Sequence, residues 1–159
     1  MDINHQIFTL SAKETKKVGR DFANRLKAVH PRSIVLALVG DLGSGKTTFV
    51  QGLAEGLEIK EKIISPTFIL QRQYEIPKSK SKITNFYHID LYRLEGDIEN
   101  EITKIGLKDT WGKPENVVVV EWADKARKSI PASAIWITFE QIDEDMRKIS
   151  INYPIGHII

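Results

Sequence analysis

A glycine-rich loop between an apolar segment and a helical repeat constrains this chain more than any other feature. Residues 40–47 read Gly-Asp-Leu-Gly-Ser-Gly-Lys-Thr and match the pattern GxxxxGK[ST] at every fixed position. Ile34–Val39 is continuously apolar, which predicts a strand buried on both faces of a parallel sheet. After the loop, apolar side chains recur at helical spacing as far as Gly56. The order of strand, glycine loop and helix predicts a P-loop within an α/β fold.

The spacing within this loop suits a phosphate group. Glycines let the backbone wrap around an anion, so that its amides and the helix N-terminus point at the charge. Lys46 would neutralise the outer phosphates, and the Thr47 hydroxyl is placed to ligate Mg²⁺. The alternative is a chance glycine-rich turn, and the strand and helix on either side count against it. The predicted nucleotide-binding residues of the loop are Asp41, Leu42, Gly43, Ser44, Gly45, Lys46, Thr47 and Thr48.

Two acidic residues at predicted strands are candidates for the metal and the hydrolytic water. Glu121 follows the four valines of residues 117–120, where a buried charge would need a cation such as Mg²⁺. Alternatively, Glu121 begins a solvated loop. Asp90 shares a strand face with His88, so it would hold metal or water, or else pair with Arg93 or His88 in a surface cluster. His88 itself is expected to be a hydrogen-bonded support, and the sequence leaves open which acid orients the water.

The segment Ser65-Pro66-Thr67-Phe68 lies shortly after the helix that follows the loop. P-loop switch proteins place a sensor of the outermost phosphate in such a position, so Thr67 is the candidate sensor. As an alternative, the segment is a turn that feeds a strand.

The remaining patterns complete one α/β domain, residues 1–159. A Ser-x-x-Glu capping box begins a helix at Ser11, and Pro31 is expected to stop it. An exposed hairpin tip is expected at residues 78–82 and a polar turn at 143–145. The other predicted elements are helices at 11–29 and 97–105 and strands at 67–75, 83–91, 135–139 and 149–153. The pattern favours a three-layer α/β/α P-loop NTPase with a mixed sheet.

Composition excludes several classes of protein. The chain has 23 Lys and Arg against 21 Asp and Glu, net +2, which is too nearly neutral for a broad nucleic-acid surface. With no cysteine, there is no disulfide, thiolate metal site or cysteine nucleophile. The longest apolar run, Ile34–Val39, is too short to span a bilayer, and the N-terminal residues lack a signal-peptide pattern. A cytoplasmic protein is expected.

Four motifs occur in order along the chain: GDLGSGKTTF, SPTF, HIDLYRL and VEW. Together they resemble the TsaE (YjeE) family, the ATPase component of bacterial tRNA threonylcarbamoyladenosine synthesis. The resemblance implies an ATPase that joins the TsaB and TsaD proteins, which transfer a threonylcarbamoyl group to tRNA, with ATP hydrolysis supporting their repeated turnover. Contact with tRNA would be indirect, through this complex, and no membrane would be involved.

Site roles follow from the same resemblance. Lys46 and its glycine neighbours would hold the phosphates of ATP, Thr47 and Glu121 would hold Mg²⁺, and Asp90 would lie at the hydrolytic site. Trp122 would sit near the nucleotide, or else serve as a core or loop anchor. The chain departs from the family where Ala123-Asp124 replaces the frequent Pro-Glu, and where residues 97–101 form a looser version of a paired-glutamate segment.

Arg147, near the last strands, is a further candidate for contact with the nucleotide, by analogy with a basic residue in some relatives. A solvated arginine is the alternative.

Two other functions share the P-loop. A small-molecule kinase needs an acceptor pocket and cations over the transferred phosphate, but the cationic stretch at 78–82 lacks arginine and resembles a solvated tip. A nucleotide switch would bind without meaningful turnover, and the absence of an Asn-Lys-x-Asp motif disfavours GTP. Because P-loop proteins often need a partner to complete the site, the expected activity is weak alone and stronger with partners.

Overall fold

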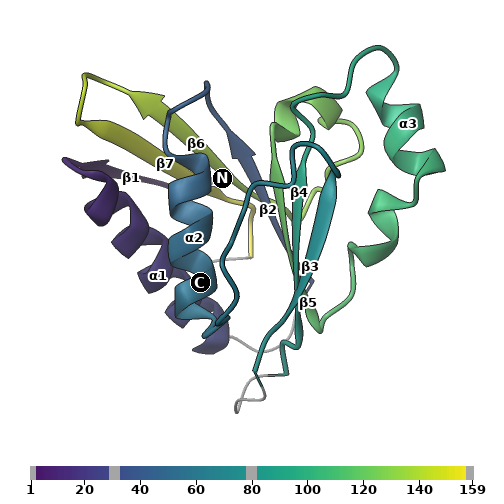
Figure 1. Cartoon of the computed structure of the whole chain (residues 1–159), viewed down its shortest axis with the longest axis horizontal. Helices are drawn as coiled ribbons and strands as arrows, with labels where there is room; N and C mark the ends of the chain where they lie inside the picture. Colours follow the sequence, from purple (N-terminus) through teal and green to yellow (C-terminus); the bar gives the residue numbers. More distant parts are fainter. Residues whose placement is uncertain (1–2, 29–32, 78–81, 157–159) are drawn as a thin grey trace.

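The computed structural model describes residues 3–28, 33–77 and 82–156. Its strands form one mixed sheet in the order β1-β7-β6-β2-β5-β4-β3 (Figure 1). The central pairs β6-β2, β2-β5 and β5-β4 are parallel, whereas β1-β7, β7-β6 and β4-β3 are antiparallel. The strands are β1 (Ile3–Thr9), β2 (Ile34–Val39), β3 (Gln71–Glu75), β4 (Asn85–Asp90), β5 (Asn116–Glu121), β6 (Ile135–Gln141) and β7 (Arg147–Tyr153).

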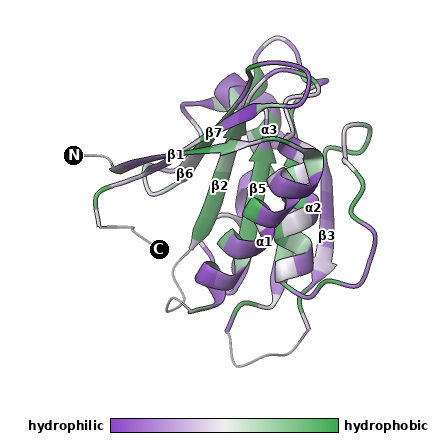
Figure 2. Cartoon of the chain, turned by 90° about the vertical axis from the view of Figure 1, so that its left-hand side faces the viewer, coloured by the Kyte–Doolittle hydropathy of each residue, from purple (hydrophilic) through white to green (hydrophobic). Residues whose placement is uncertain are grey.

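Helices cover both faces of this sheet, which confirms the predicted three-layer α/β fold with a mixed sheet. The elements of one face are α1 (Ala12–Ala28) and α2 (Lys46–Gly56), and those of the other are α3 (Ile98–Lys104) and the 3-10 turns η1 (Leu107–Thr110) and η2 (Ala123–Ala126). Val117 and Val119 of β5 join the core beneath α1 and α2, whereas Val118 and Val120 join the opposite core. The valine run is therefore buried on both faces, and Figure 2 shows β2 and β5 as apolar strands between the layers.

Glycines bring α1 and α2 unusually close together. A Cβ added to Gly52 of α2 would collide with the carbonyl oxygen of Lys16 on α1, and one added to Gly19 of α1 would collide with the carbonyl oxygen of Phe49. Backbone therefore meets backbone at two points along this helix pair. Since α2 begins at Lys46, this contact fixes the helix that carries the end of the glycine loop.

Two parts of the chain differ from the sequence expectation. The prediction of a strand from residue 67 is wrong for 67–70, because the Pro66 carbonyl accepts hydrogen bonds from the amides of Ile69 and Leu70 in a turn. Leu70 has φ +65°, which no strand allows. β1 was not predicted, since it is short of apolar side chains and pairs with β7 from the far end of the chain.

Some expectations fall outside the described residues. They are the helix end between residues 29 and 31 and the hairpin tip at 78–82, apart from Lys82.

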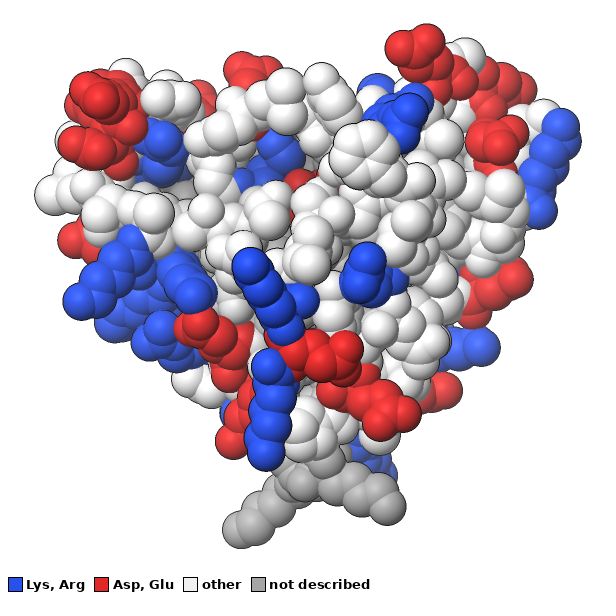
Figure 3. Space-filling view, viewed as in Figure 1, with Lys and Arg blue, Asp and Glu red and all other residues white. Residues whose placement is uncertain are grey.

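The surface over α1 and α2 mixes charges of both signs. Lys and Arg side chains lie beside Asp and Glu side chains across this face (Figure 3). Glu55 pairs with both Lys16 at 2.5 Å and Arg20 at 3.0 Å, and Lys17 pairs with Asp21 at 2.5 Å. No helix among the described residues is long and apolar enough to cross a membrane.

Candidate functional site

The glycine loop closes around the ammonium group of Lys46. Lys46 Nζ donates hydrogen bonds to the carbonyl oxygens of Gly40 at 2.5 Å and Asp41 at 2.8 Å. Gly43 and Gly45 have φ +74° and +104°, values that residues with a side chain rarely adopt. These two glycines let the chain turn tightly between β2 and α2, so the loop amides and the helix N-terminus gather at one place.

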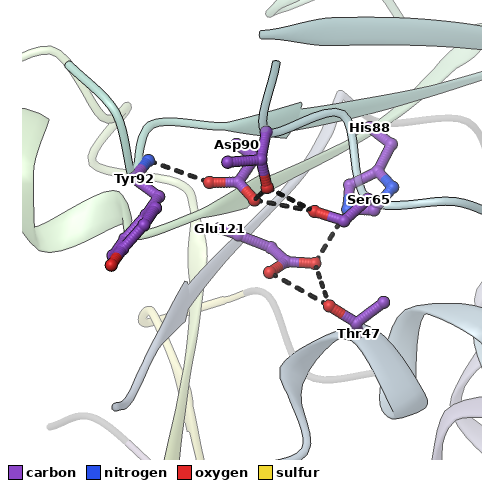
Figure 4. Close-up of polar contacts among 7 residues, drawn as sticks. Thr47, Ser65, His88, Asp90, Tyr92 and Glu121 are labelled. Carbon is purple, nitrogen blue, oxygen red and sulfur yellow. Dashed lines mark hydrogen bonds and ion pairs between the residues drawn. The ribbon is translucent and has the colours of Figure 1, made fainter. Parts of the chain in front are cut away.

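Glu121 and Thr47 meet at the carboxyl end of the central strands. Thr47 Oγ1 donates to Glu121 Oε1 at 3.2 Å and lies 3.4 Å from Oε2 (Figure 4). Glu121 is only 2% exposed, so the alternative of a solvated loop residue is wrong. Thr47 lies in the first turn of α2, and Glu121 is the last residue of β5. The parallel pairing of β2 with β5 brings these two residues together. A hydroxyl and a carboxylate are oxygen donors of the kind that Mg²⁺ prefers.

Asp90 is the neighbour of Glu121 across the β4–β5 pair, and both oxygens of its carboxylate accept hydrogen bonds. Asp90 Oδ2 accepts from the hydroxyls of Ser65 and Thr67, each at 2.8 Å. Its Oδ1 accepts from the backbone amide of Tyr92 at 2.8 Å (Figure 4). Thr67, the predicted sensor, thus lies against Asp90 through the turn that replaces the expected strand. The pairing of Asp90 with Arg93 or His88 is not what the structure shows.

Trp122 adopts a left-handed backbone conformation with φ +58°, which turns the chain sharply after β5. Its ring lies 4.4 Å from Lys46 Nζ, a cation–π contact, and 5.0 Å from the ring of Tyr92. Trp122 therefore contacts both Lys46, the last residue of the Gly-Lys pair in the predicted loop pattern, and the tyrosine that follows β4.

These groups surround one cavity of about 370 Å³. It brings together ten of the predicted site residues: Leu42, Gly43, Gly45, Lys46, Thr47, Thr48, Thr67, Asp90, Glu121 and Trp122. Ser65 and Tyr92 also line it, and the sequence analysis did not propose them as site residues. For Ser65 the signal was its place in the SPTF motif, two residues before Thr67. Tyr92 had no signal beyond its place in the HIDLYRL motif.

Three predicted residues lie outside the lining of this cavity. Asp41 is exposed, and the buried Ser44 hydroxyl has no hydrogen-bond partner among the described residues. Arg147 is partly exposed, and its guanidinium donates to the carbonyl oxygens of Asp143 and Glu144 at 3.1 and 3.0 Å. It also reaches the carbonyl oxygen of Gly43 at 3.5 Å, which ties the β6–β7 turn to the glycine loop.

A second cavity of about 160 Å³ lies on the other side of the glycine loop. It shares Gly43, Gly45 and Thr48 with the first cavity. Its other lining residues come from α1 and the β6–β7 turn: Ala12, Thr15, Glu144, Asp145 and Arg147. Two cavities therefore border the glycine loop and the start of α2.

Burial sets the electrostatics of the first cavity. Lys46 is 5% exposed, and desolvation lowers the pKa of its ammonium group from the usual value. The negative charges of Glu121 and Asp90 act in the opposite direction on the same pKa. A buried cation beside two carboxylates, at a helix N-terminus, suits a highly charged anion with its counter-cation better than it suits an apolar ligand.

Comparisons with known proteins agree with the four motifs. The family model for the threonylcarbamoyl adenosine biosynthesis protein TsaE matches residues 9–149. The tRNA threonylcarbamoyladenosine biosynthesis protein TsaE of Bacillus subtilis (strain 168) is 34% identical over 142 residues, covering 89% of this chain and 81% of the relative. Its counterpart in Aquifex aeolicus (strain VF5) is 35% identical over 153 residues, covering 95% and 98%.

The same likeness appears in three dimensions. The crystal structure of Bacillus subtilis YdiB is similar to this fold with a TM-score of 0.69 at 27% identity, over 96% of this chain and 87% of that one. Both the sequence and the structure thus match over nearly the whole chain. This chain belongs to the TsaE family, whose members take part in tRNA threonylcarbamoyladenosine biosynthesis.

Proposed function

We propose that this chain is a Mg²⁺-dependent ATP hydrolase whose activity supports repeated turnover of a TsaB–TsaD complex in the cytoplasm. The single observation that carries the proposal is the hydrogen bond between Thr47 and Glu121, which joins the glycine loop to the carboxylate at the end of β5. P-loop hydrolases need a hydroxyl and an acid at this position to hold Mg²⁺ beside the outer phosphates. The donor set of the cavity fits that requirement.

The residues of the first cavity divide into two groups. Thr47 and Glu121 would hold Mg²⁺, and Lys46 would leave the loop carbonyls to neutralise the phosphates. Mg²⁺ would supply neutralisation of the charge that develops on the phosphate oxygens. Asp90 lies beside Glu121 and accepts hydrogen bonds from Ser65 and Thr67 rather than from Thr47, so we assign to it the orientation of the attacking water.

The second cavity suits the nucleoside of ATP. It shares lining residues Gly43, Gly45 and Thr48 with the first cavity, and from these residues a nucleotide whose phosphates fill the first cavity would extend its ribose and base toward Arg147. Glu144 and Asp145 offer acceptors for ribose hydroxyls or the adenine amino group, and Arg147 offers a planar cation for stacking.

The decisive experiment is phosphate release from Mg·ATP by the purified chain, with and without TsaB and TsaD. We expect slow release alone and stimulated release with the partners. Asp90→Asn should bind ATP as the wild type does and lose about 100-fold or more of the stimulated rate, because it removes a positioned proton acceptor. Glu121→Gln should lose the Mg²⁺-dependent part of ATP binding as well.

Two outcomes would overturn the proposal. Phosphate that appears on an added acceptor, rather than free in solution, would make the chain a kinase. ATP binding without release, at any partner concentration, would make it a non-catalytic switch. The Asp90→Asn variant is the control for both results, because it is expected to bind ATP without hydrolysing it at the wild-type rate.

A further inference from the structure

His88 is the most completely buried polar residue beside the site, with 0% of its surface exposed. It lies on β4, where the strand register pairs it with Val119 and places it diagonally across from Glu121 on β5. His88 Nε2 lies 2.8 Å from Glu121 Oε1 (Figure 4). His88 is thus hydrogen-bonded, as the sequence analysis expected, and its partner is Glu121 rather than Asp90.

The hydrogen bond between these two residues has one plausible direction. A carboxylate only accepts, so the imidazole Nε2 carries the hydrogen and donates it to Glu121. The other ring nitrogen, Nδ1, is buried and has no hydrogen-bond partner among the described residues. Within the part of the chain that the structure describes, the polar contact of His88 is therefore directed to Glu121 alone.

Glu121 depends on few partners for its orientation. Its carboxylate is 2% exposed and receives hydrogen bonds from the Thr47 hydroxyl and from His88. The loss of one of two donors leaves the orientation of a buried carboxylate less well fixed, because the nearby charge of Lys46 attracts Glu121 but makes no hydrogen bond to it among the described residues. The four valines before Glu121 supply packing but no donor side chain.

We propose that His88 is a positioning residue: its Nε2–H holds Glu121 so that the carboxylate faces Thr47 and a bound Mg²⁺. The inference rests on the proposed function, because it gives His88 a part in the same metal site. Side chains that orient a metal ligand typically change metal affinity by about 10- to 100-fold when they are removed. His88 would act through Glu121 and would touch neither ATP nor the metal.

Two substitutions of His88 test this role in the full chain. His88→Gln keeps an N–H donor at nearly the position of the imidazole Nε2, whereas His88→Leu fills the space without a donor. Calorimetry would measure how Mg²⁺ strengthens ATP binding and the Mg²⁺ concentration that gives half of this effect. We expect His88→Leu to raise that concentration by about 10-fold or more. His88→Gln should restore most of the response, and His5→Leu, on the exposed β1, should match the wild type.

If the His88→Leu chain does not fold, the comparison of His88→Asn with His88→Gln still tests the inference. His88→Asn places its amide too far from Glu121, so it should lose the Mg²⁺ response that His88→Gln retains. Equal responses in the glutamine and asparagine variants, at equal melting temperatures, would overturn the inference. A normal Mg²⁺ response in a folded His88→Leu chain would overturn it too.

The same titration separates this inference from the proposed function. ATP binding that ignores Mg²⁺ in the wild type would overturn the proposed function, and the role of His88 with it. A Mg²⁺ response in the wild type that His88→Leu preserves would overturn only the role of His88.

Discussion

Lys46 has opposite effects on binding and on folding. Its ammonium group lies in a nearly closed position, where burial lowers its pKa, yet its charge is what a polyphosphate requires. The carbonyl oxygens of Gly40 and Asp41 and the ring of Trp122 compensate part of the desolvation. On the proposed function, Lys46 would therefore favour ligand binding at a cost in stability, as groups at binding sites often do.

Lys46→Met should separate these two effects. Methionine keeps the length and apolar stem of lysine but removes the charge, so ATP affinity should fall by about 10- to 100-fold, the contribution of one to two charge-assisted hydrogen bonds. The melting temperature at pH 7 should be unchanged or slightly higher, since a buried charge is lost. Calorimetric titration with ATP and thermal unfolding would check both, and unchanged ATP affinity would contradict the phosphate assignment.

The pH dependence of stability gives a further test of the same residue. Because the pKa of Lys46 is lower in the folded than in the unfolded chain, its proton opposes folding below the folded pKa. This destabilisation is relieved as pH rises through the folded pKa toward the unfolded value. The free energy of unfolding of the wild type, minus that of Lys46→Met, should therefore increase between neutral and alkaline pH. A constant difference, measured by urea unfolding, would contradict the pKa shift.

Among the secondary-structure elements, the α1–α2 pair sets the position of the helix that carries Lys46 and Thr47. Lys46 and Thr47 lie in the first turn of α2, so any displacement of this helix moves both of these side chains. The pair is held by glycines at which backbone meets backbone, and it has no room for a side chain there. Packing as tight as this cannot adjust to an added methyl group without moving a whole helix.

Gly52→Ala should therefore destabilise the fold by about 1–3 kcal/mol, the usual range for overpacking, even though alanine is the better helix former. Thermal and urea unfolding would measure the loss. Asn24→Ala, on the exposed face of α1, is the matched control and should leave stability unchanged or slightly raised. A Gly52→Ala chain as stable as that control would mean that the two helices separate easily.

The β6–β7 turn is the element that the nucleoside assignment depends on. Arg147 ties this turn to the glycine loop through the Gly43 carbonyl oxygen. If the base of ATP lies in the second cavity, Arg147→Ala should weaken ATP binding by about 5- to 10-fold, equivalent to one net hydrogen bond or cation–π contact. Binding of inorganic triphosphate should stay the same, and an equal loss for both ligands would place the effect on the loop instead.

At the scale of the whole molecule, the proposed ligand would bridge parts of the chain that are distant in sequence. The first cavity draws on the glycine loop, the 65–67 segment and the ends of β4 and β5. A ligand that binds only the folded state stabilises it by about 2.7 kcal/mol at 100 times its dissociation constant. For a domain of this size, that is an increase in melting temperature of about 5–10 °C.

Mg·ATP should produce this increase in the melting temperature of the wild type. ATP with a chelator should produce a smaller increase. Differential scanning calorimetry with both ligands, beside the Lys46→Met chain, would measure the difference. An identical shift in the two chains would mean that ATP binds away from the glycine loop.

The sequence alone determined the local parts of this protein. The GxxxxGK[ST] pattern, the apolar run before it and the four valines of β5 predicted the loop, the buried strands and the fold class, because each is encoded by neighbouring residues. It also predicted most of the residues around the first cavity, including Glu121 and Asp90. Those residues end predicted parallel strands, and such strands meet at one edge of a sheet.

The contacts among these residues depend on the folded chain as a whole. The sequence allowed His88 to support Asp90, but the β4–β5 register sends it to Glu121 and leaves Asp90 to Ser65, Thr67 and the Tyr92 amide. The edge strand β1 likewise forms only because β7 offers it a partner from the other end of the chain. Strand register and long-range pairing depend on the whole packed sheet, and no window of neighbouring residues contains that information.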